Sequence, residues 1–388
     1  MSARSLIFPQ AEFQARTTRL QGQMHADGLD ALLLTAAADI FYVTGFLTRF
    51  WESPARPWFV VVPAQGAPVA VIPAIGADLM GRSWVQDIRT WPAPMPGDDG
   101  VTLLADTLAE LVEKTGRIGL PMGLETHLRM PLADYRRVEA ALAPRQCVDA
   151  THTVQRVREI KSEAEINKIR ASCALAGRAF DRVPEFAQHG CALDQVFRRF
   201  QMALLEEGAD WVSYVAGAAG QGGYGDVISP AGPTPLAMGD VLMLDTGAVR
   251  DGYFCDFDRN YSIGPASAPL AQAHSALWHA TEAVLHSLRP GMRACDVHRL
   301  LCDEIVKQGA QPGAGRLGHG LGVTLTEWPS FTPQATTPLR AGMVLTLEPG
   351  VALGDGTRIL VHEENIVLRE NGCELLSPRA PETLPEIS

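Results

Sequence analysis

The sequence predicts two domains of different class: a smaller α/β domain over residues 1–155 and a larger α+β domain over residues 156–388. Three observations predict this division. Apolar runs of strand length alternate with helical patterns in the first third of the chain, strands and helices come in blocks after it, and a helix-start signal lies at the junction. A chain of 388 residues is long enough to bury two such cores.

In the first domain, the spacing of the apolar residues predicts each element. Residues 10–27 and 101–114 carry apolar side chains at helical spacing among polar ones. Three continuous apolar runs, as expected of strands buried on both faces, are LDALLL (29–34), FVVVP (59–63) and VAVI (69–72).

The second domain is predicted to open with a long amphipathic helix. Ser162 precedes Glu165 by three residues, the signature of a capping box, and apolar residues then recur every three or four positions. Further helices are predicted over residues 192–207, 269–288 and 295–309, with strands bounded by Gly and Pro between and after them.

Composition restricts the partners. The net charge of −11 argues against nucleic acid or an anionic membrane as the main partner. The N-terminus, MSARSLIFPQAEF, lacks an apolar targeting segment, and no run of ~18 uncharged apolar residues occurs. Seven dispersed cysteines without a CxxC pair indicate free thiols in a reducing compartment. We therefore expect a cytoplasmic protein.

The stretch LMLDTGAVRDGYFCDFDR (242–259) places three aspartates in an apolar setting, where an unpaired charge is costly to bury. The Asp-Gly pair at 251–252 is a strong two-residue hairpin turn. Counting back from it places Asp245 opposite Asp258, with Asp256 on the same face. Either this face is solvated and its aspartates are incidental, or a cation lies there and offsets their repulsion.

Other candidate ligands lie farther along. His319 stands among glycines in GHGLG, although a lone histidine is more often structural than a ligand. Glu348 ends the strand-like LTLEPG, and Glu363 and Glu364 lie in VHEENIVL, where only one of two neighbours can face a given site. Four carboxylates and an imidazole suit Mn²⁺, Zn²⁺, Co²⁺ or Fe²⁺. Two such ions would neutralise the cluster.

Taken together, Asp245 and Asp256 eleven residues apart, GHGLG, LEPG and EEN resemble the creatinase/prolidase/aminopeptidase P/methionine aminopeptidase family, which has the pita-bread fold. DALLLTAAADIFYVTGF is similar to the N-terminal domain of the creatinase and prolidase members, and VREIKSEAEINKIR resembles the start of their catalytic domain. The resemblance covers almost the whole chain. It implies a creatinase-type N-terminal α/β domain before a pita-bread catalytic domain.

The resemblance also implies roles for single residues. Asp245 would chelate one divalent ion, and His319 and Glu348 would hold the other, with Mn²⁺ the first candidate metal. Asp256 and Glu363 would bridge both ions; Glu363 is preferred over its neighbour because the family's bridging glutamate precedes an acidic or amide residue. Glu348 and His319 are then the catalytic candidates. A water or hydroxide between the metals would attack an amide carbonyl while Glu348 moves its proton.

The chain departs from the family's peptidases at two histidines. One precedes the first metal aspartate by roughly seventeen residues in that pattern, but no histidine lies here between His189 and Asp245. The other begins an HExP motif, where this chain has Thr326. A threonine hydroxyl can donate a hydrogen bond but carries no charge near neutral pH.

Two further segments are expected near the substrate. The glycine-rich GAAGQGGYGD (217–226) lacks the ending of a phosphate loop and is predicted to form one wall of the site as a loop that offers Tyr224 and Asp226 to the substrate. The aromatic residues Phe50, Trp51 and Trp58 either pack in the first core or reach the site of a partner subunit, as in related dimers.

The leading functional hypothesis is a homodimeric Xaa-Pro dipeptidase or aminopeptidase P-like metallohydrolase that acts on a dipeptide. The first alternative is a non-peptidase member that acts on a small C–N or C–S substrate, like creatinase or a dimethylsulfoniopropionate lyase. The missing histidines favour this alternative. The second alternative is a binding protein without catalysis.

Overall fold

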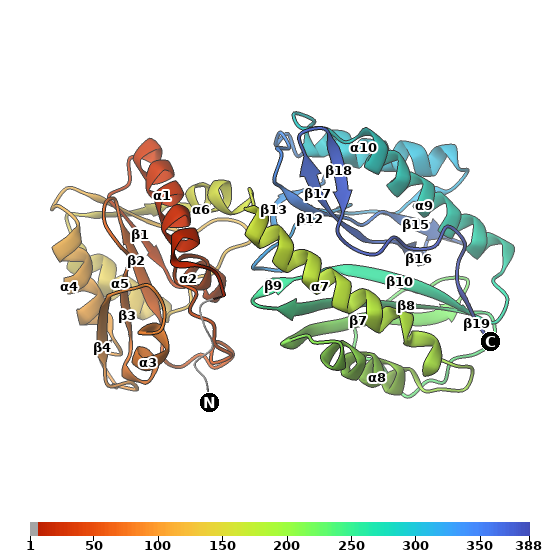
Figure 1. Ribbon diagram of the computed structural model, residues 1–388, viewed down its shortest axis with the longest axis horizontal. Helices are drawn as coiled ribbons and strands as arrows, with labels where there is room; N and C mark the ends of the chain where they lie inside the picture. The colour runs from red at the N-terminus through yellow and green to blue at the C-terminus, as the bar shows by residue number, and fades with distance from the viewer. Residues whose placement is uncertain (1–6) are drawn as a thin grey trace. The chain divides into compact units, whose positions relative to one another are not determined.

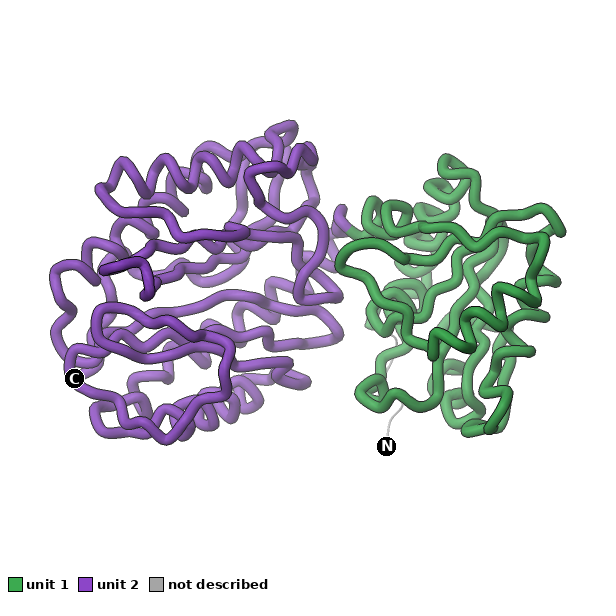
Figure 2. Tube along the Cα trace, turned by 180° about the vertical axis from the view of Figure 1, so that it is seen from behind, with its two compact units in different colours: residues 1–158 green, residues 159–388 purple. Residues whose placement is uncertain are grey.

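The computed structural model describes residues 7–388, so the first six residues of the N-terminal segment lie outside the described chain. The chain divides into two compact units, one up to Arg158 and one from Glu159 to the C-terminus (Figure 2). The expected boundary at residues 155–156 falls inside helix α6 (Thr151–Arg158), which belongs to the first unit. Among the helices of residues 7–388, none has the length and apolarity needed to cross a bilayer.

The first unit is a mixed six-stranded sheet with helices on both faces (Figure 1). Its strands lie in the order β4-β3-β2-β1-β5-β6. The strands are β1 (Ala31–Leu34), β2 (Phe59–Pro63), β3 (Val69–Pro73), β4 (Asp87–Trp91), β5 (Arg117–Leu120) and β6 (Gln146–Asp149). The helices besides α6 are α1 (Gln10–Asp27), α2 (Ala37–Thr44), η1 (Ala74–Gly76), α3 (Ala77–Met80), α4 (Val101–Leu111) and α5 (Leu132–Leu142).

Strand alternation divides the first core between the two faces of this sheet. Leu32 and Leu34 of β1 pack with residues of α1, α2 and α6, whereas Leu33 packs with residues of α4 and α5. Both faces are therefore apolar, which explains the continuous apolar runs in the sequence. Trp51 and Trp58 pack against each other at 5.8 Å between ring centroids, whereas Phe50 is 55% exposed.

The second unit contains two five-stranded sheets and one three-stranded sheet. One large sheet has the order β19-β10-β8-β7, with β9 on β8, and the other has the order β13-β12-β14-β17-β18. The small sheet is β11-β15-β16.

Strands of the first large sheet are β7 (Trp211–Gln221), β8 (Asp240–Arg250), β9 (Tyr253–Phe254), β10 (Phe257–Ile263) and β19 (Glu386–Ile387). Strands of the second are β12 (His319–Gly320), β13 (Glu327–Ser330), β14 (Val344–Leu347), β17 (Glu364–Arg369) and β18 (Gly372–Leu375). The small sheet has β11 (Gln311–Pro312), β15 (Gly350–Leu353) and β16 (Arg358–Val361).

Helices cover each large sheet (Figure 1). They are α7 (Glu163–Asp181), η2 (Val183–Glu185), α8 (Leu193–Glu206), α9 (Ala268–Ser287) and α10 (Ala294–Lys307). Helix α7 contacts β8 and α8 contacts β7, while α9 contacts β18 and α10 packs on α9. The predicted capping box at the start of α7 is present, with the Ser162 side chain accepting from the Glu165 N–H and the Glu165 side chain accepting from the Ser162 N–H.

The glycine-rich stretch differs from the prediction. Strand β7 continues through Gln221, which pairs with Asp240 of β8, so the first half of the stretch is a strand and not a loop. At Gly217, with φ of +142°, a Cβ would lie 2.1 Å from the Met243 carbonyl oxygen. Glycine there allows the two backbones to approach closely, and the close approach extends the sheet.

Candidate metal centre

The acidic hairpin forms with the register counted from its turn. Strands β8 and β10 pair antiparallel, with Asp258 opposite Asp245, which confirms the prediction. Asp251 and Gly252 both have positive φ, 52° and 81°, as a two-residue turn of this type requires. Asp256 and Asp258 are only 4% and 1% exposed, so the hairpin face is not solvated. Asp256 lies in the short break between β9 and β10.

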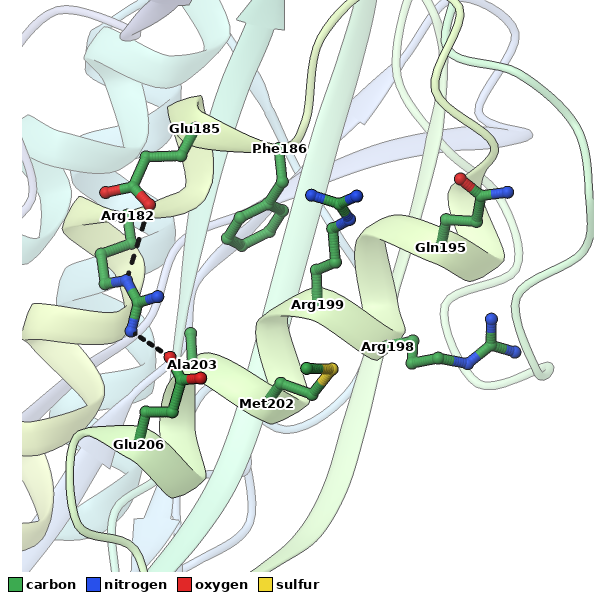
Figure 3. A pocket seen from close by; sticks show the side chains of 9 residues that line it. All are labelled: Arg182, Glu185, Phe186, Gln195, Arg198, Arg199, Met202, Ala203 and Glu206. Carbon is green, nitrogen blue, oxygen red and sulfur yellow. Dashed lines mark ion pairs between the residues drawn. The ribbon is translucent and has the colours of Figure 1, made fainter.

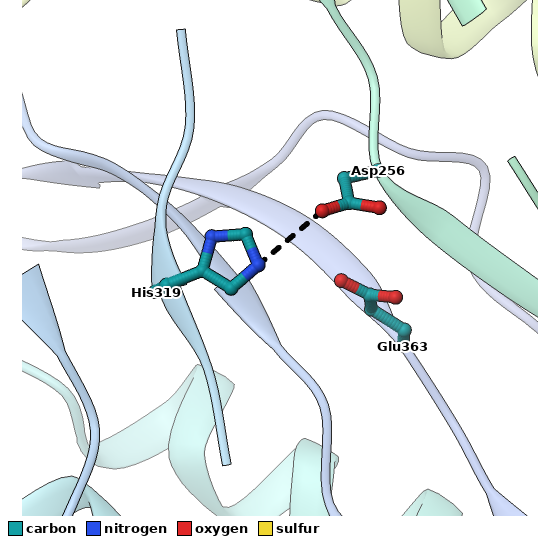
Figure 4. A group of neighbouring side chains, drawn as sticks. All are labelled: Asp256, His319 and Glu363. Carbon is teal, nitrogen blue, oxygen red and sulfur yellow. Dashed lines mark ion pairs between the residues drawn. The ribbon is translucent and has the colours of Figure 1, made fainter. Parts of the chain in front are cut away.

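Three ligand candidates come from the other large sheet of the unit. His319 lies on β12, Glu348 directly follows β14, and Glu363 directly precedes β17. His319 Nε2 lies 3.3 Å from Asp256 Oδ2 and 3.7 Å from Glu348 Oε1. Asp256, His319 and Glu363 each offer a ligand atom within 4.8 Å of the others, and their side chains converge in Figure 4.

The orientation of the imidazole is set by its own strand. His319 Nδ1 lies 2.8 Å from the Gly320 carbonyl oxygen. Because a carbonyl only accepts, Nδ1 carries a proton, and Nε2 is the atom that faces the carboxylates: it donates to Asp256 when it is protonated and could bind a metal when it is not. A Cβ at Gly320 would lie 2.4 Å from the Trp328 carbonyl oxygen, so glycine beside the histidine lets the neighbouring strand pack closely.

The carboxylates of the cluster suppress each other's ionisation. Burial and the charges of Asp256 and Asp258 raise the pKa of Asp245 well above its usual range. Burial and the charge of Asp256 do the same to the pKa of Glu363. Although burial opposes a charged imidazole, the hydrogen bond with Asp256 raises the pKa of His319 above its usual value. A cation is the complement that such a cluster needs.

The donor set suits divalent metal ions. Among residues 7–388, no hydrogen-bond donor reaches the buried Glu363 Oε1, so a strong acceptor atom is left for a ligand. Carboxylate oxygens and one imidazole nitrogen suit Mn²⁺, Zn²⁺, Co²⁺ or Fe²⁺. Asp245, Asp256, His319, Glu348 and Glu363 would hold these ions.

The two adjacent glutamates face different surroundings. Glu363 joins the cluster, whereas the Glu364 carboxylate lies 3.1 Å from both Arg259 and Arg379 and also accepts from the Ser377 hydroxyl. Although burial opposes the charge, Arg259 and the other neighbours hold the pKa of Glu364 well below its usual range. Glu364 is thus neutralised within the protein, and the geometry favours Glu363 as the ligand.

Tyr214 is a residue of the site that the sequence did not predict. Its hydroxyl lies 3.1 Å from both carboxylate oxygens of Asp245 and also within hydrogen-bond distance of Asp256. A register shift in β7 between Val212 and Val215 brings the ring to this place. The only local signal is Gly247, where a Cβ would lie 2.5 Å from the Tyr214 ring.

Two residues predicted to contact the substrate, Thr326 and Tyr224, differ in their exposure to solvent. Thr326 is partly exposed on the segment 322–326. In the same segment, the Leu325 side chain lies close to Gly247, beside the Tyr214 ring. Tyr224, by contrast, is 1% exposed, and its hydroxyl donates to Asn260 Oδ1 and accepts from the Val361 N–H. The expectation that Tyr224 meets the substrate is therefore wrong in this structure, because its hydroxyl is used inside the core.

A separate surface groove of 610 Å³ lies between η2 and α8 (Figure 3). Its lining is Arg182, Glu185, Phe186, Gln195, Arg198, Arg199, Met202, Ala203 and Glu206. Arg182 is paired there with Glu206 at 2.9 Å. None of the candidate ligands lines the groove, so the chemistry of the carboxylate cluster does not depend on it.

The chain is similar to known proteins over most of its length. The model of metallopeptidase family M24 matches residues 167–370, and that of the creatinase/prolidase N-terminal domain matches residues 16–160. A probable dipeptidase PepE of Mycobacterium tuberculosis is 30% identical over 378 residues, 94% of each chain. The crystal structure of dipeptidase PepE from Mycobacterium ulcerans has a TM-score of 0.83 at 28% identity and covers 98% of this chain and 99% of that chain. A prolidase from Thermococcus sibiricus shares the fold, with a TM-score of 0.84 at 22% identity over 96% of this chain and 99% of that chain.

These matches confirm the predicted α+β pita-bread domain after a creatinase-type α/β domain. The protein is a metallohydrolase that is similar to dipeptidases. The family model matches residues 167–370, and the buried carboxylates and imidazole in that range provide atoms that can bind a metal. The chain therefore belongs to metallopeptidase family M24.

Proposed function

We propose that this chain hydrolyses short peptides, with an Xaa-Pro dipeptide as the first candidate substrate. The observation that carries the proposal is the buried group of Asp256, His319 and Glu363 within 4.8 Å, with Asp245 and Glu348 against it. The similarity to a probable dipeptidase over 94% of the chain supports a peptide substrate.

Divalent ions, when bound, would polarise the scissile carbonyl and lower the pKa of a water molecule. Glu348 is our candidate to move a proton, because its side chain is 25% exposed and burial raises its pKa despite the nearby His319 and Arg316. We propose His319 as a metal ligand through Nε2, which lies 3.7 Å from this carboxylate. Thr326 is our candidate for contact with the substrate.

A second candidate function is cleavage of a small C–N or C–S substrate. Thr326 stands where family peptidases have histidine, and the residue seventeen positions before Asp245 is Ile228, with an 89% exposed side chain. Losing one oxyanion-type donor typically slows catalysis about 10²–10³-fold. The family assignment argues against the third reading, a binding protein without catalysis.

One experiment tests the ligand set and the function together. Purified protein should contain about two divalent ions per chain, and Asp256→Ala or Glu363→Ala should remove tight metal binding. Glu364→Gln is the matched control, because it removes the charge of a carboxylate that is paired with Arg259 and Arg379 outside the cluster and keeps oxygen and nitrogen atoms for hydrogen bonds. Each form is then assayed on dipeptides and small amides. Unchanged metal content in both ligand variants would refute the assignment, and activity on small amides alone would favour the second function.

Three finer features belong to the same proposal: Mn²⁺ as the working metal, a homodimer and a cytoplasmic location. All seven cysteines, each within the described chain, are free thiols, which suits a reducing compartment. Metal analysis of protein from its natural host, light scattering and cell fractionation test the three features in turn.

A further inference from the structure

The backbone at Asp256 lies on an open edge of its sheet. Cys255 N–H donates to the Ala248 carbonyl of β8, so the polar groups of the next residue point away from β8. The other neighbour of β10 is β19, which pairs only with Ser262 and Ile263. No strand of the described chain therefore covers the N–H and C=O of Asp256.

A side chain takes the place of that missing strand. Asn365 Oδ1 accepts from the Asp256 N–H at 3.0 Å, and Asn365 Nδ2 donates to the Asp256 carbonyl oxygen. Because the backbone N–H must donate and the carbonyl must accept, this pair fixes which amide atom is oxygen and which is nitrogen. One carboxamide thus satisfies both backbone groups of a candidate metal ligand.

The carboxamide is itself held firmly. Asn365 is 0% exposed. Its backbone N–H donates to the Ser377 hydroxyl at 3.0 Å, and its backbone carbonyl accepts from the Leu376 N–H at 2.8 Å. The Cys173 thiol lies 3.3 Å from Asn365 Oδ1. Within β17, Asn365 also pairs with Thr346 of β14. The amide has little freedom to release Asp256.

We infer that Asn365 is a positioning residue for the metal centre. It clamps the backbone of Asp256 from the same segment that supplies Glu363, two residues earlier, and so fixes the two proposed bridging carboxylates relative to each other. The inference rests on the ligand set proposed above. Partners that orient metal ligands typically change metal affinity about 10–100-fold when removed.

The test is calorimetric titration of Mn²⁺ into the metal-free full chain. Asn365→Leu keeps the approximate shape and removes both hydrogen bonds, and Asn365→Ser keeps one small polar group, so that the test survives if the leucine form does not fold. Neither variant changes charge. Cys173→Ala is the matched control, because it removes a contact to the same carboxamide and leaves the clamp on Asp256.

We expect about 10–100-fold weaker Mn²⁺ binding in the Asn365 variants and wild-type binding in Cys173→Ala, with folding checked by circular dichroism. A lower melting temperature of the metal-free Asn365 variants with wild-type Mn²⁺ affinity would show a merely structural role and overturn the inference. No Mn²⁺ binding by the wild-type protein would instead overturn the proposed ligand set and the inference with it.

Discussion

The metal-free protein should lose stability as the pH rises, because buried acids in its site hold protons. Asp258 is one such acid, because it is 1% exposed and burial raises its pKa from 3.8 to about 7. Between these values the folded chain binds more protons than the unfolded chain, so the free energy of unfolding falls as pH rises. The full contribution is at most about 4 kcal/mol, and roughly 3 kcal/mol of it is lost between pH 5 and pH 8.

Other groups act with and against this trend. The raised pKa values of Asp245, Glu363 and His319 give contributions of the same sign. Burial lowers the pKa of His274, and it lowers that of His362 to about 4, so these histidines make the protein less stable as pH falls below their ordinary value of 6.5. The contribution of Asp258 therefore has to be isolated by a variant.

Asp258→Asn is that variant, because it removes the titrating group and keeps an acceptor for the Glu363 N–H. Urea unfolding of both forms, with a chelator present, is followed at pH 5 and pH 8. The stability of the wild type relative to the variant should fall by roughly 3 kcal/mol over this range. A constant difference, or a wild type that gains relative stability at pH 8, would refute the reasoning.

Three further predictions concern the same unit. Mn²⁺ binding near neutral pH should release protons, because the site carboxylates have raised pKa values; calorimetric heats that do not vary with buffer ionisation enthalpy would contradict this. Glu327→Leu should destabilise the protein by about 3–5 kcal/mol in urea unfolding, because it leaves Lys161, 2.9 Å away and 2% exposed, as a buried charge. If the second candidate function holds, Thr326→His should raise kcat/KM on an Xaa-Pro dipeptide by less than about tenfold, since a site shaped for another substrate does not orient the peptide; a larger gain would count against that function.

The parts of the site that the sequence predicts are those encoded locally. Asp245 and Asp258 could be placed opposite each other because the two-residue turn at 251–252 sets the register of the strands beside it. The helices and buried strands that periodicity predicted are present, with boundaries that shift by a few residues. The Tyr224 prediction failed because Tyr224 lies beyond the end of β7 and its backbone bridges to Ile359 of β16, where the side chain is buried.

The residues that sequence reasoning missed act only through tertiary contacts. Tyr214 reaches Asp245 across a register shift, and no spacing in the chain encodes that shift. Asn365 meets Asp256 from 109 positions away in the sequence. Tyrosine is common in strands and asparagine is not, but neither residue type reveals its contacts, which only the paired sheets show.

The EEN segment shows how one strand can serve both the site and the fold. Glu363 and Asn365, two residues apart, both lie against Asp256. The Glu363 carboxylate lies near the Asp256 carboxylate in the ligand cluster, and the Asn365 side chain accepts from the Asp256 backbone N–H. Glu364 between them anchors the C-terminal segment, accepting from the Ala380 N–H at 2.8 Å. A slip of one residue would exchange these faces and would place the arginine-paired carboxylate in the site.

The ligand set is thus tied to the register of a buried strand, whereas Thr326 lies on a partly exposed segment outside the strands. Substrate preference can therefore change at Thr326 without a change in the metal ligands.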